Sequence, residues 1–146
     1  MVKEGVSVVK AIRDRYRGDN RNPWNEIECG SNYARSMASY ALMPIFSGFR
    51  FAMQDRTIGF CPVTEGDFRS IWAVDSAWGR FERSGGRTDI KVIAGKLSLL
   101  ALELPYYSKV NSVMIDGKPS EFTFRSGTII AAIDAGWSIS VAGELK

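Results

Sequence analysis

The chain has 146 residues, of which 45% are hydrophobic and 24% charged, and it contains eight Phe, five Tyr and four Trp. This composition indicates one folded globular domain, or one domain and a fragment, and it excludes an intrinsically disordered chain. The formal charge of +3 is modest, and the absence of histidine excludes the usual Ser-His and Cys-His catalytic pairs, so any catalysis would have to use carboxylates.

The first predicted element is an amphipathic helix over residues 2–17. Its apolar side chains recur at helical spacing, and Lys or Arg side chains occupy the other sides. Gly18 and the turn-forming residues after it end the helix. Six Lys or Arg fall within the first 21 residues. This excess leaves nucleic-acid binding open, but a solvated helical face explains it better, so nucleic acid is not the expected partner.

A loop over residues 18–30 leads to a second predicted helix over residues 31–46. Apolar residues fall on almost every side of this helix, and Arg35 lies on its one narrow polar stripe. We therefore expect the second helix to be buried nearly all round. Pro44 should kink or tighten the helix before Gly48, because proline removes a backbone hydrogen bond.

From residue 49 onward the hydrophobic period changes from helical to alternating, and short segments are bounded by Gly, Pro, Asp or Ser. Strands are expected at residues 49–53, 57–62, 68–74, 78–83, 90–94, 97–104, 110–115, 121–124, 128–133 and 137–141. The pairs Asp55-Arg56 and Asp116-Gly117 predict hairpin turns, and the second is the stronger signal.

The predicted fold class is α+β: two N-terminal helices followed by an antiparallel β-sandwich-like region. Many short strands separated by regular turn signals favour the sandwich. The boundary is expected near Ser47-Gly48, which gives a helical domain over residues 1–47 and a β-rich domain over residues 48–146.

Two cysteines, Cys29 and Cys61, have no CxxC spacing, so the sequence indicates neither a zinc site nor a redox pair. We expect both to be buried free thiols, and no metal or cofactor is implied. No apolar run approaches the roughly 20 residues that span a bilayer, and the N-terminal residues lack the apolar core of a signal peptide. A cytoplasmic location is the resulting expectation.

The candidate site lies in the loop before the second helix and in the first turns of that helix. In one account, an acid pairs with Arg35 and ties the loop to the helix. In the other, Glu26, Glu28 and Arg35 bind a ligand rich in hydroxyls, while Trp24 or Tyr33 stacks on the apolar face of a sugar. The spacing does not decide between them. Glu26 and Glu28 are not expected to form a glycosidase pair, because residues two positions apart in an extended loop point to opposite sides.

Residues 21–30, 33–39 and 47–49 (RNPWNEIECG, YARSMAS and SGF) resemble the C-terminal end of the catalytic domain of glycoside hydrolase family 116, the family of the bile-acid β-glucosidases. The resemblance covers about 50 residues. The segment at residues 58–62 (IGFCP) and the β-rich remainder are compatible with it but are weaker signals. Members of that family are much longer retaining β-glucosidases with an (α/α)6 barrel.

The resemblance implies that residues 1–47 are a remnant of such a barrel. Its nucleophilic glutamate and acid/base aspartate would lie upstream, so no catalytic residue is expected in this chain. Glu26 and Arg35 correspond to the residues that hold the glucose hydroxyls, and Asn32 stands where relatives often have histidine. The chain is thus expected to be a non-catalytic C-terminal portion of a β-glucosidase-like protein that retains part of a glucose-binding subsite.

The expected partners are a glucose-like sugar and either a second copy of the chain or the missing portion of the barrel, because the apolar sides of the helices need a covering surface. Packing of the helices on the sandwich would also cover them. The alternative function is a stand-alone adaptor for a protein or nucleic-acid partner.

Overall fold

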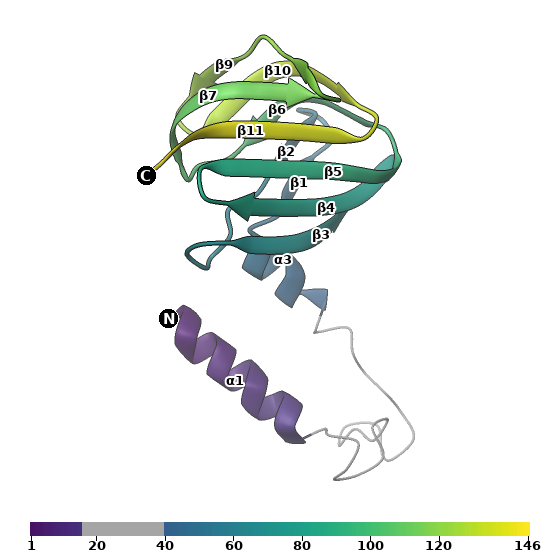
Figure 1. The fold of residues 1–146 in the computed structure, drawn as a ribbon. Coiled ribbons are helices and arrows are strands. Elements are labelled where there is room, and N and C mark those ends of the chain that lie inside the picture. The colour runs from purple at the N-terminus through teal and green to yellow at the C-terminus, as the bar shows by residue number, and fades with distance from the viewer. Residues whose placement is uncertain (16–39) are drawn as a thin grey trace. The chain divides into compact units, whose positions relative to one another are not determined.

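The computed structural model describes residues 1–15 and 40–146, which belong to two compact units that cover residues 1–42 and 43–146. The first unit contains helix α1 (Val2–Arg15), so the predicted N-terminal helix is confirmed over its described length (Figure 1). None of the residues of α1 is buried. Among the described helices, none has the length and apolar character that crossing a bilayer requires.

Helix α3 (Leu42–Ser47) is the described end of the second predicted helix. Pro44 lies in its first turn, where a missing N–H leaves no gap in the helical hydrogen bonds. The expectation of burial nearly all round is wrong for this part of the helix, because Met43 and Ile45 are exposed and Ser47 is buried. Only one side of α3 contacts the strands that follow. No described residue covers the remaining sides of the helix.

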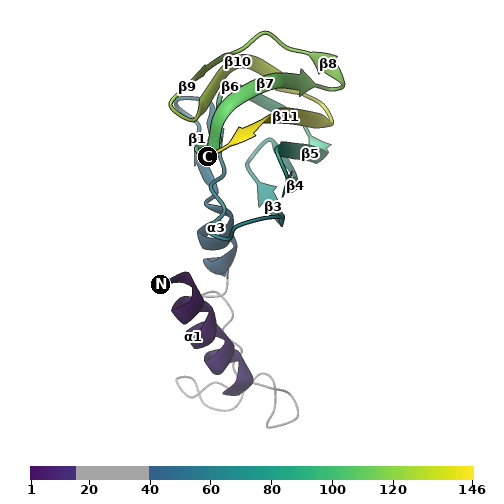
Figure 2. The same ribbon diagram turned by 60° about the vertical axis from the view of Figure 1, so that its left-hand side comes forward.

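The second unit is a sandwich of two β-sheets, which confirms the predicted α+β class with a β-rich, sandwich-like region (Figures 1 and 2). The five-stranded sheet has the order β1-β2-β6-β10-β9 and the six-stranded sheet the order β3-β4-β5-β11-β7-β8. The described strands pair antiparallel, as predicted, except β2 and β6, which pair parallel.

The bounds of the strands fall close to the predicted ones. The five-stranded sheet contains β1 (Arg50–Ala52), β2 (Thr57–Gly59), β6 (Leu97–Glu103), β10 (Thr128–Ala135) and β9 (Thr123–Arg125). The six-stranded sheet contains β3 (Phe68–Ala73), β4 (Ala77–Ser84), β5 (Arg87–Gly95), β11 (Ser138–Leu145), β7 (Tyr107–Ile115) and β8 (Lys118–Pro119).

Both predicted turn pairs close hairpins. Asp116 and Gly117 have φ angles of +48° and +75°, the left-handed region that a two-residue type I′ turn requires, and they join β7 to β8. Arg56, with a φ of +48°, turns the chain from β1 into β2. Strand β8, which is visible in Figure 2, was not predicted, because it is only the two-residue return of its hairpin.

The hydrophobic core lies between the two sheets. Its strands alternate buried and exposed positions, as β4 and β10 do along their whole length. The rings of Phe60 and Phe81 stack with their centroids 4.1 Å apart and join the chain after β2 to strand β4 of the other sheet. The largest fully buried side chains are those of Tyr107, Phe60, Phe81, Ile58, Ile90, Leu97, Leu99, Leu102, Leu104, Ile129, Ile133 and Ile139.

The environment of Cys61 differs from the expectation. Its thiol is free but exposed, not buried. The flanking residues Phe60 and Pro62 are both buried, so the alternation of an extended chain turns Cys61 toward solvent. Cys29 lies outside the described residues.

Candidate functional site

The residues that the sequence singles out for sugar binding, Trp24, Glu26, Glu28 and Arg35, lie outside the described residues, as does Asn32. Their roles stay predictions. The structure does describe the end of the segment that carries them, where α3 joins the sandwich.

Helix α3 ends in a turn that docks on the chain after β2. The N–H of Phe49 donates to the carbonyl of Pro44 at 3.2 Å, a bond of the Schellman type, and Gly48 has the positive φ of +59° that this ending needs. The N–H of Cys61 donates to the carbonyl of Ser47 at 3.0 Å. A Cβ at Gly48 would lie 2.2 Å from the carbonyl oxygen of Cys61, so the two backbones are in direct contact.

Two side-chain contacts strengthen this junction. The Ser47 hydroxyl donates to the carbonyl of Met43 at 2.7 Å within the helix. The rings of Phe49 and Phe60 lie with their centroids 5.4 Å apart, and Phe60 is buried in the core. The junction therefore unites residues 47–49 and 58–62, the two segments that follow the motif in the resemblance.

A groove lies on the outer face of the six-stranded sheet. It encloses about 290 Å³ and runs along β11, between β5 and β7. Its lining residues are Arg87, Ser112, Met114, Gly117, Trp137, Ser138, Ser140, Val141 and Ala142. The outward side chains of β11 are small, whereas those of the neighbouring strands are larger, and this difference forms the groove.

Trp137 stands at one end of the groove, held by a turn with a fixed backbone. The carboxylate of Asp116 accepts three backbone N–H groups, from Gly136 at 2.7 Å and from Trp137 and Ser138 at 2.8 Å each. These bonds, led by that of Ser138, hold the pKa of Asp116 below its ordinary value. The indole lies over Gly117, where a Cβ would be 3.4 Å from the ring, and remains 58% exposed.

A polar cluster holds the other end of the groove. The Arg87 guanidinium donates to both carboxylate oxygens of Asp89, at 2.8 and 3.0 Å, and Ser140 donates to Asp89 at 2.5 Å. Burial opposes the ionisation of Asp89, but these hydrogen bonds outweigh it, so the pKa of Asp89 lies below its ordinary value. The charges of this pair are therefore mutually compensated.

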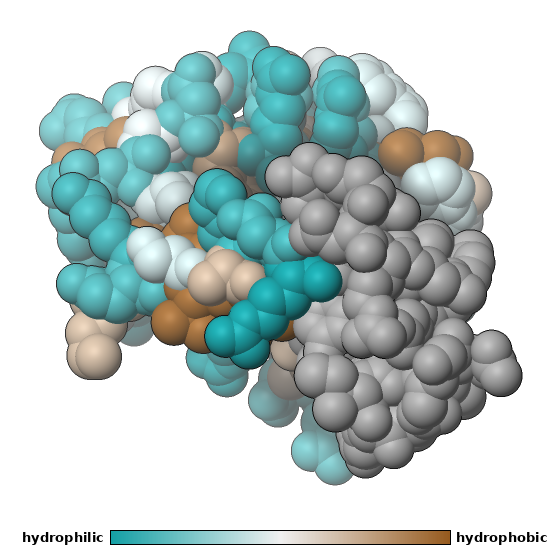
Figure 3. All heavy atoms as spheres, turned by 90° about the horizontal axis from the view of Figure 1, so that it is seen from below, coloured by the Kyte–Doolittle hydropathy of each residue, from teal (hydrophilic) through white to brown (hydrophobic). Residues whose placement is uncertain are grey.

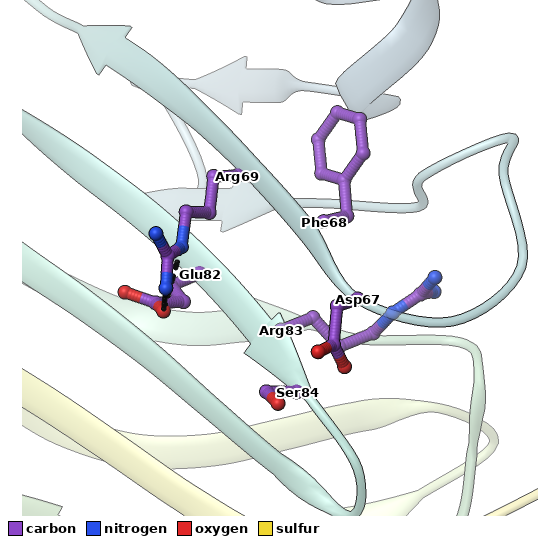
Figure 4. A pocket seen from close by; sticks show the side chains of 6 residues that line it. All are labelled: Asp67, Phe68, Arg69, Glu82, Arg83 and Ser84. Atoms are coloured by element: carbon purple, nitrogen blue, oxygen red, sulfur yellow. Dashed lines mark hydrogen bonds and ion pairs between the residues drawn. The ribbon is translucent and has the colours of Figure 1, made fainter.

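A second hollow, of about 320 Å³, lies where β3 begins and β4 ends (Figure 4). Arg69 and Glu82 pair across these strands at 2.7 Å, and Phe68 points away from them. The Arg83 guanidinium extends toward the preceding loop, where it donates to the carbonyls of Thr64 at 2.6 Å and Gly66 at 2.7 Å. Three of the four charged side chains described in its lining, Arg69, Glu82 and Arg83, are engaged with protein partners, which makes it a weaker candidate for ligand binding.

Arg83 also begins a buried polar network that the sequence did not reveal. Its guanidinium lies 5.1 Å from the centre of the Tyr106 ring. The hydroxyl of Thr88, which is fully buried, lies 2.9 Å from that of Tyr106 and 3.1 Å from that of Tyr107. Burial raises the pKa of both tyrosines. The two tyrosines therefore stay uncharged, and the guanidinium of Arg83 is the one cation of this network. The alternating pattern alone would have predicted apolar residues at these buried positions.

In the part of the chain that the structure describes, no cluster of three or more Cys, Asp or Glu side chains has the arrangement of a metal site. Comparison with known proteins finds no family model and no curated protein that matches this chain.

Proposed function

We propose that this chain is a non-catalytic C-terminal portion of a β-glucosidase-like protein of the family 116 type. In this proposal, Glu26 and Arg35 hold hydroxyls of a glucose-like sugar, with Trp24 and Glu28 beside them. The β-sandwich serves as the support to which the motif-bearing segment is attached.

The observation that carries the proposal is the junction between α3 and the chain after β2. The sequence resemblance consists of the motif, the SGF segment and the weaker IGFCP segment, and the junction joins the last two through the bond from Cys61 to Ser47 at 3.0 Å. The junction fixes the chain directly after the motif-bearing segment to the sandwich. The junction thus gives a structural reason for these two segments to accompany the motif.

The test is a titration of the full chain with glucose and with a gluco-configured imidazole, followed by NMR shifts and tryptophan fluorescence. Half of a subsite should bind with at best millimolar affinity, about 4 kcal/mol. Glu26→Gln and Arg35→Lys should each abolish the shifts of residues 22–37, whereas Glu121→Gln, on an exposed residue of the sandwich, should not. Shifts of residues 22–37 that persist unchanged in both site variants would contradict the proposed roles.

The non-catalytic part of the proposal is tested with an aryl β-glucoside. The purified chain should release no nitrophenol. Release that disappears in Glu26→Gln would show that the chain is an enzyme and would refute this part.

A second candidate function, an adaptor for another macromolecule, is favoured by exposed apolar side chains on the six-stranded sheet. Ile71, Trp78 and Ile93 lie on the adjacent strands β3, β4 and β5 and are 58%, 48% and 57% exposed. Apolar residues also interrupt the polar surface of the described residues in the view from below (Figure 3). Contiguous exposed apolar side chains are typical of interaction surfaces.

The salt dependence of binding distinguishes a nucleic-acid partner from a protein partner. Binding to DNA or RNA that weakens steeply with salt would indicate a nucleic-acid adaptor. No retention on heparin at low salt would exclude that version and leave a protein partner.

A further inference from the structure

We infer that the groove along β11 is a second binding site, which takes a neutral, hydroxyl-rich ring ligand such as a pyranose unit of an oligosaccharide. This site lies wholly within the sandwich and does not depend on Glu26 or Arg35.

The groove contains a polar group that lacks a protein partner. Ser138 lines it and is only 6% exposed, yet its hydroxyl has no hydrogen-bond partner among the described residues. Its neighbour Ile139 points into the core, so alternation directs the side chain of Ser138 to the outer face. This hydroxyl is not among the described side-chain atoms that are shielded from solvent without a partner, so water reaches it in the free protein. A ligand in the groove can replace that water with a donor or an acceptor.

The charge of the groove favours a neutral ligand. Arg87 is the one charged residue of the lining that the structure describes, and Asp89 compensates its guanidinium through two hydrogen bonds. Lys91, which pairs with Ser138 in the strand register, lies outside the lining, so the groove itself carries little net charge. The Nη1 group of Arg87 has no partner among the described residues and keeps two N–H donors. Together with the hydroxyls of Ser112 and Ser138, these donors and acceptors suit the vicinal hydroxyls of a sugar.

The aromatic end of the groove supplies an apolar surface on which a sugar ring can stack. Trp137 is exposed but held in place, because Asp116 fixes the backbone of its turn and the ring lies over Gly117. A fixed indole offers a flat apolar surface for the C–H face of a pyranose at little cost in side-chain entropy. A proline-rich peptide fits less well, since its helix docks in grooves lined by several aromatic side chains and this groove has one.

The experiment is a titration of the full-length chain with hexasaccharides of the cello, malto, laminari and xylo series, each up to about 10 mM, which covers millimolar affinity. Amide and indole NMR shifts locate the binding. We expect at least one series to shift the signals of Trp137 and Ser138. Absence of shifts with all four series, or shifts confined to residues outside the groove, would overturn the inference.

Matched variants sharpen the test. Trp137→Ala should weaken binding by about tenfold or more, since it removes the stacking surface. Ser138→Ala should weaken it less. Trp78→Ala removes the exposed tryptophan of β4 outside the groove and should leave binding unchanged. Equal losses in both tryptophan variants, with unchanged circular dichroism, would contradict the assignment of the site.

Two further outcomes separate the alternatives. The double variant Glu26→Gln/Arg35→Lys should still bind the oligosaccharide at the groove, so failure of the proposed function leaves this inference standing. Binding of a polyproline peptide at Trp137, in place of any oligosaccharide, would replace the sugar by a peptide ligand and refute the inference as stated.

Discussion

At the scale of single residues, Asp116 has the clearest structural role. Its carboxylate binds three N–H groups of the turn that carries Trp137. We expect Asp116→Asn to lower the Tm at pH 7, because an amide offers one acceptor oxygen in place of two. Asparagine tolerates the left-handed φ of +48° at this position, so the backbone should remain unchanged.

The pH dependence of this effect has a definite sign. The pKa of Asp116 is lowered in the folded state, so its contribution is complete above the unfolded pKa of about 3.9 and disappears as the pH falls through the lowered value. The Tm difference between the wild type and Asp116→Asn should therefore shrink below about pH 4. Asp134→Asn removes an exposed ion pair with Lys96 and should have little effect at any pH. A constant Tm difference across the acid range would contradict the proposed role of the charge.

The second prediction at this scale concerns Arg83. Arg83→Met should lower the free energy of unfolding by about 2–4 kcal/mol, because it leaves the carbonyls of Thr64 and Gly66 without their donor. Arg80→Met is the matched control, since Arg80 on the same strand is more exposed and makes a longer ion pair of 3.7 Å with Glu82. Its effect should stay below about 1 kcal/mol. Urea unfolding followed by tryptophan fluorescence measures both, and equal losses would refute a structural role of the buried network.

At the scale of elements, the strands were predictable because turn residues and alternation act locally. Asp116-Gly117 specified its hairpin, since both positions require positive φ. The parallel pairing of β2 with β6 was not predictable, because the two strands are far apart in the sequence and no turn signal fixes their partner. The burial of the second helix was overestimated because an apolar pattern shows which residues need a cover but not whether the same chain provides it.

The junction after α3 provides the prediction at this scale. Gly48→Ala should destabilise the sandwich by more than about 1–2 kcal/mol, because it adds a clash with Cys61 to the strain of a positive φ. Gly85→Ala has a similar φ of +54° and meets no atom within 4 Å, so it should show the strain alone. The difference in urea midpoints measures the contact between the two backbones. Equal midpoints for the two variants would mean that the backbone at Cys61 moves away from the added Cβ without loss of stability.

Across the whole molecule, the two candidate sites differ in how their residues are brought together. One lies within a single segment of the sequence, and the other is formed by neighbouring strands. The motif around Glu26 and Arg35 could be proposed from the sequence because its residues lie within one short segment, and its role stays a prediction. The groove could not be proposed in this way, since register alone brings Asp89 and Met114 to either side of Ser140. The only local signals were an exposed tryptophan after a turn and the small outward residues of β11, and neither indicates a site without the neighbouring strands.

The last prediction concerns association. Met43 and Ile45 on α3 are 40% and 58% exposed, and leaving such side chains in water forgoes roughly 1.5–3 kcal/mol for each that could be fully buried. We therefore expect the chain to self-associate in a concentration-dependent way through these residues. Light scattering should show a dimer that Met43→Glu/Ile45→Glu dissociates, whereas Ile130→Glu, at a side chain of β10 that is 51% exposed, should leave it intact. A monomer at every concentration would contradict the prediction. A dimer lost only in Ile130→Glu would place the contact on the five-stranded sheet instead.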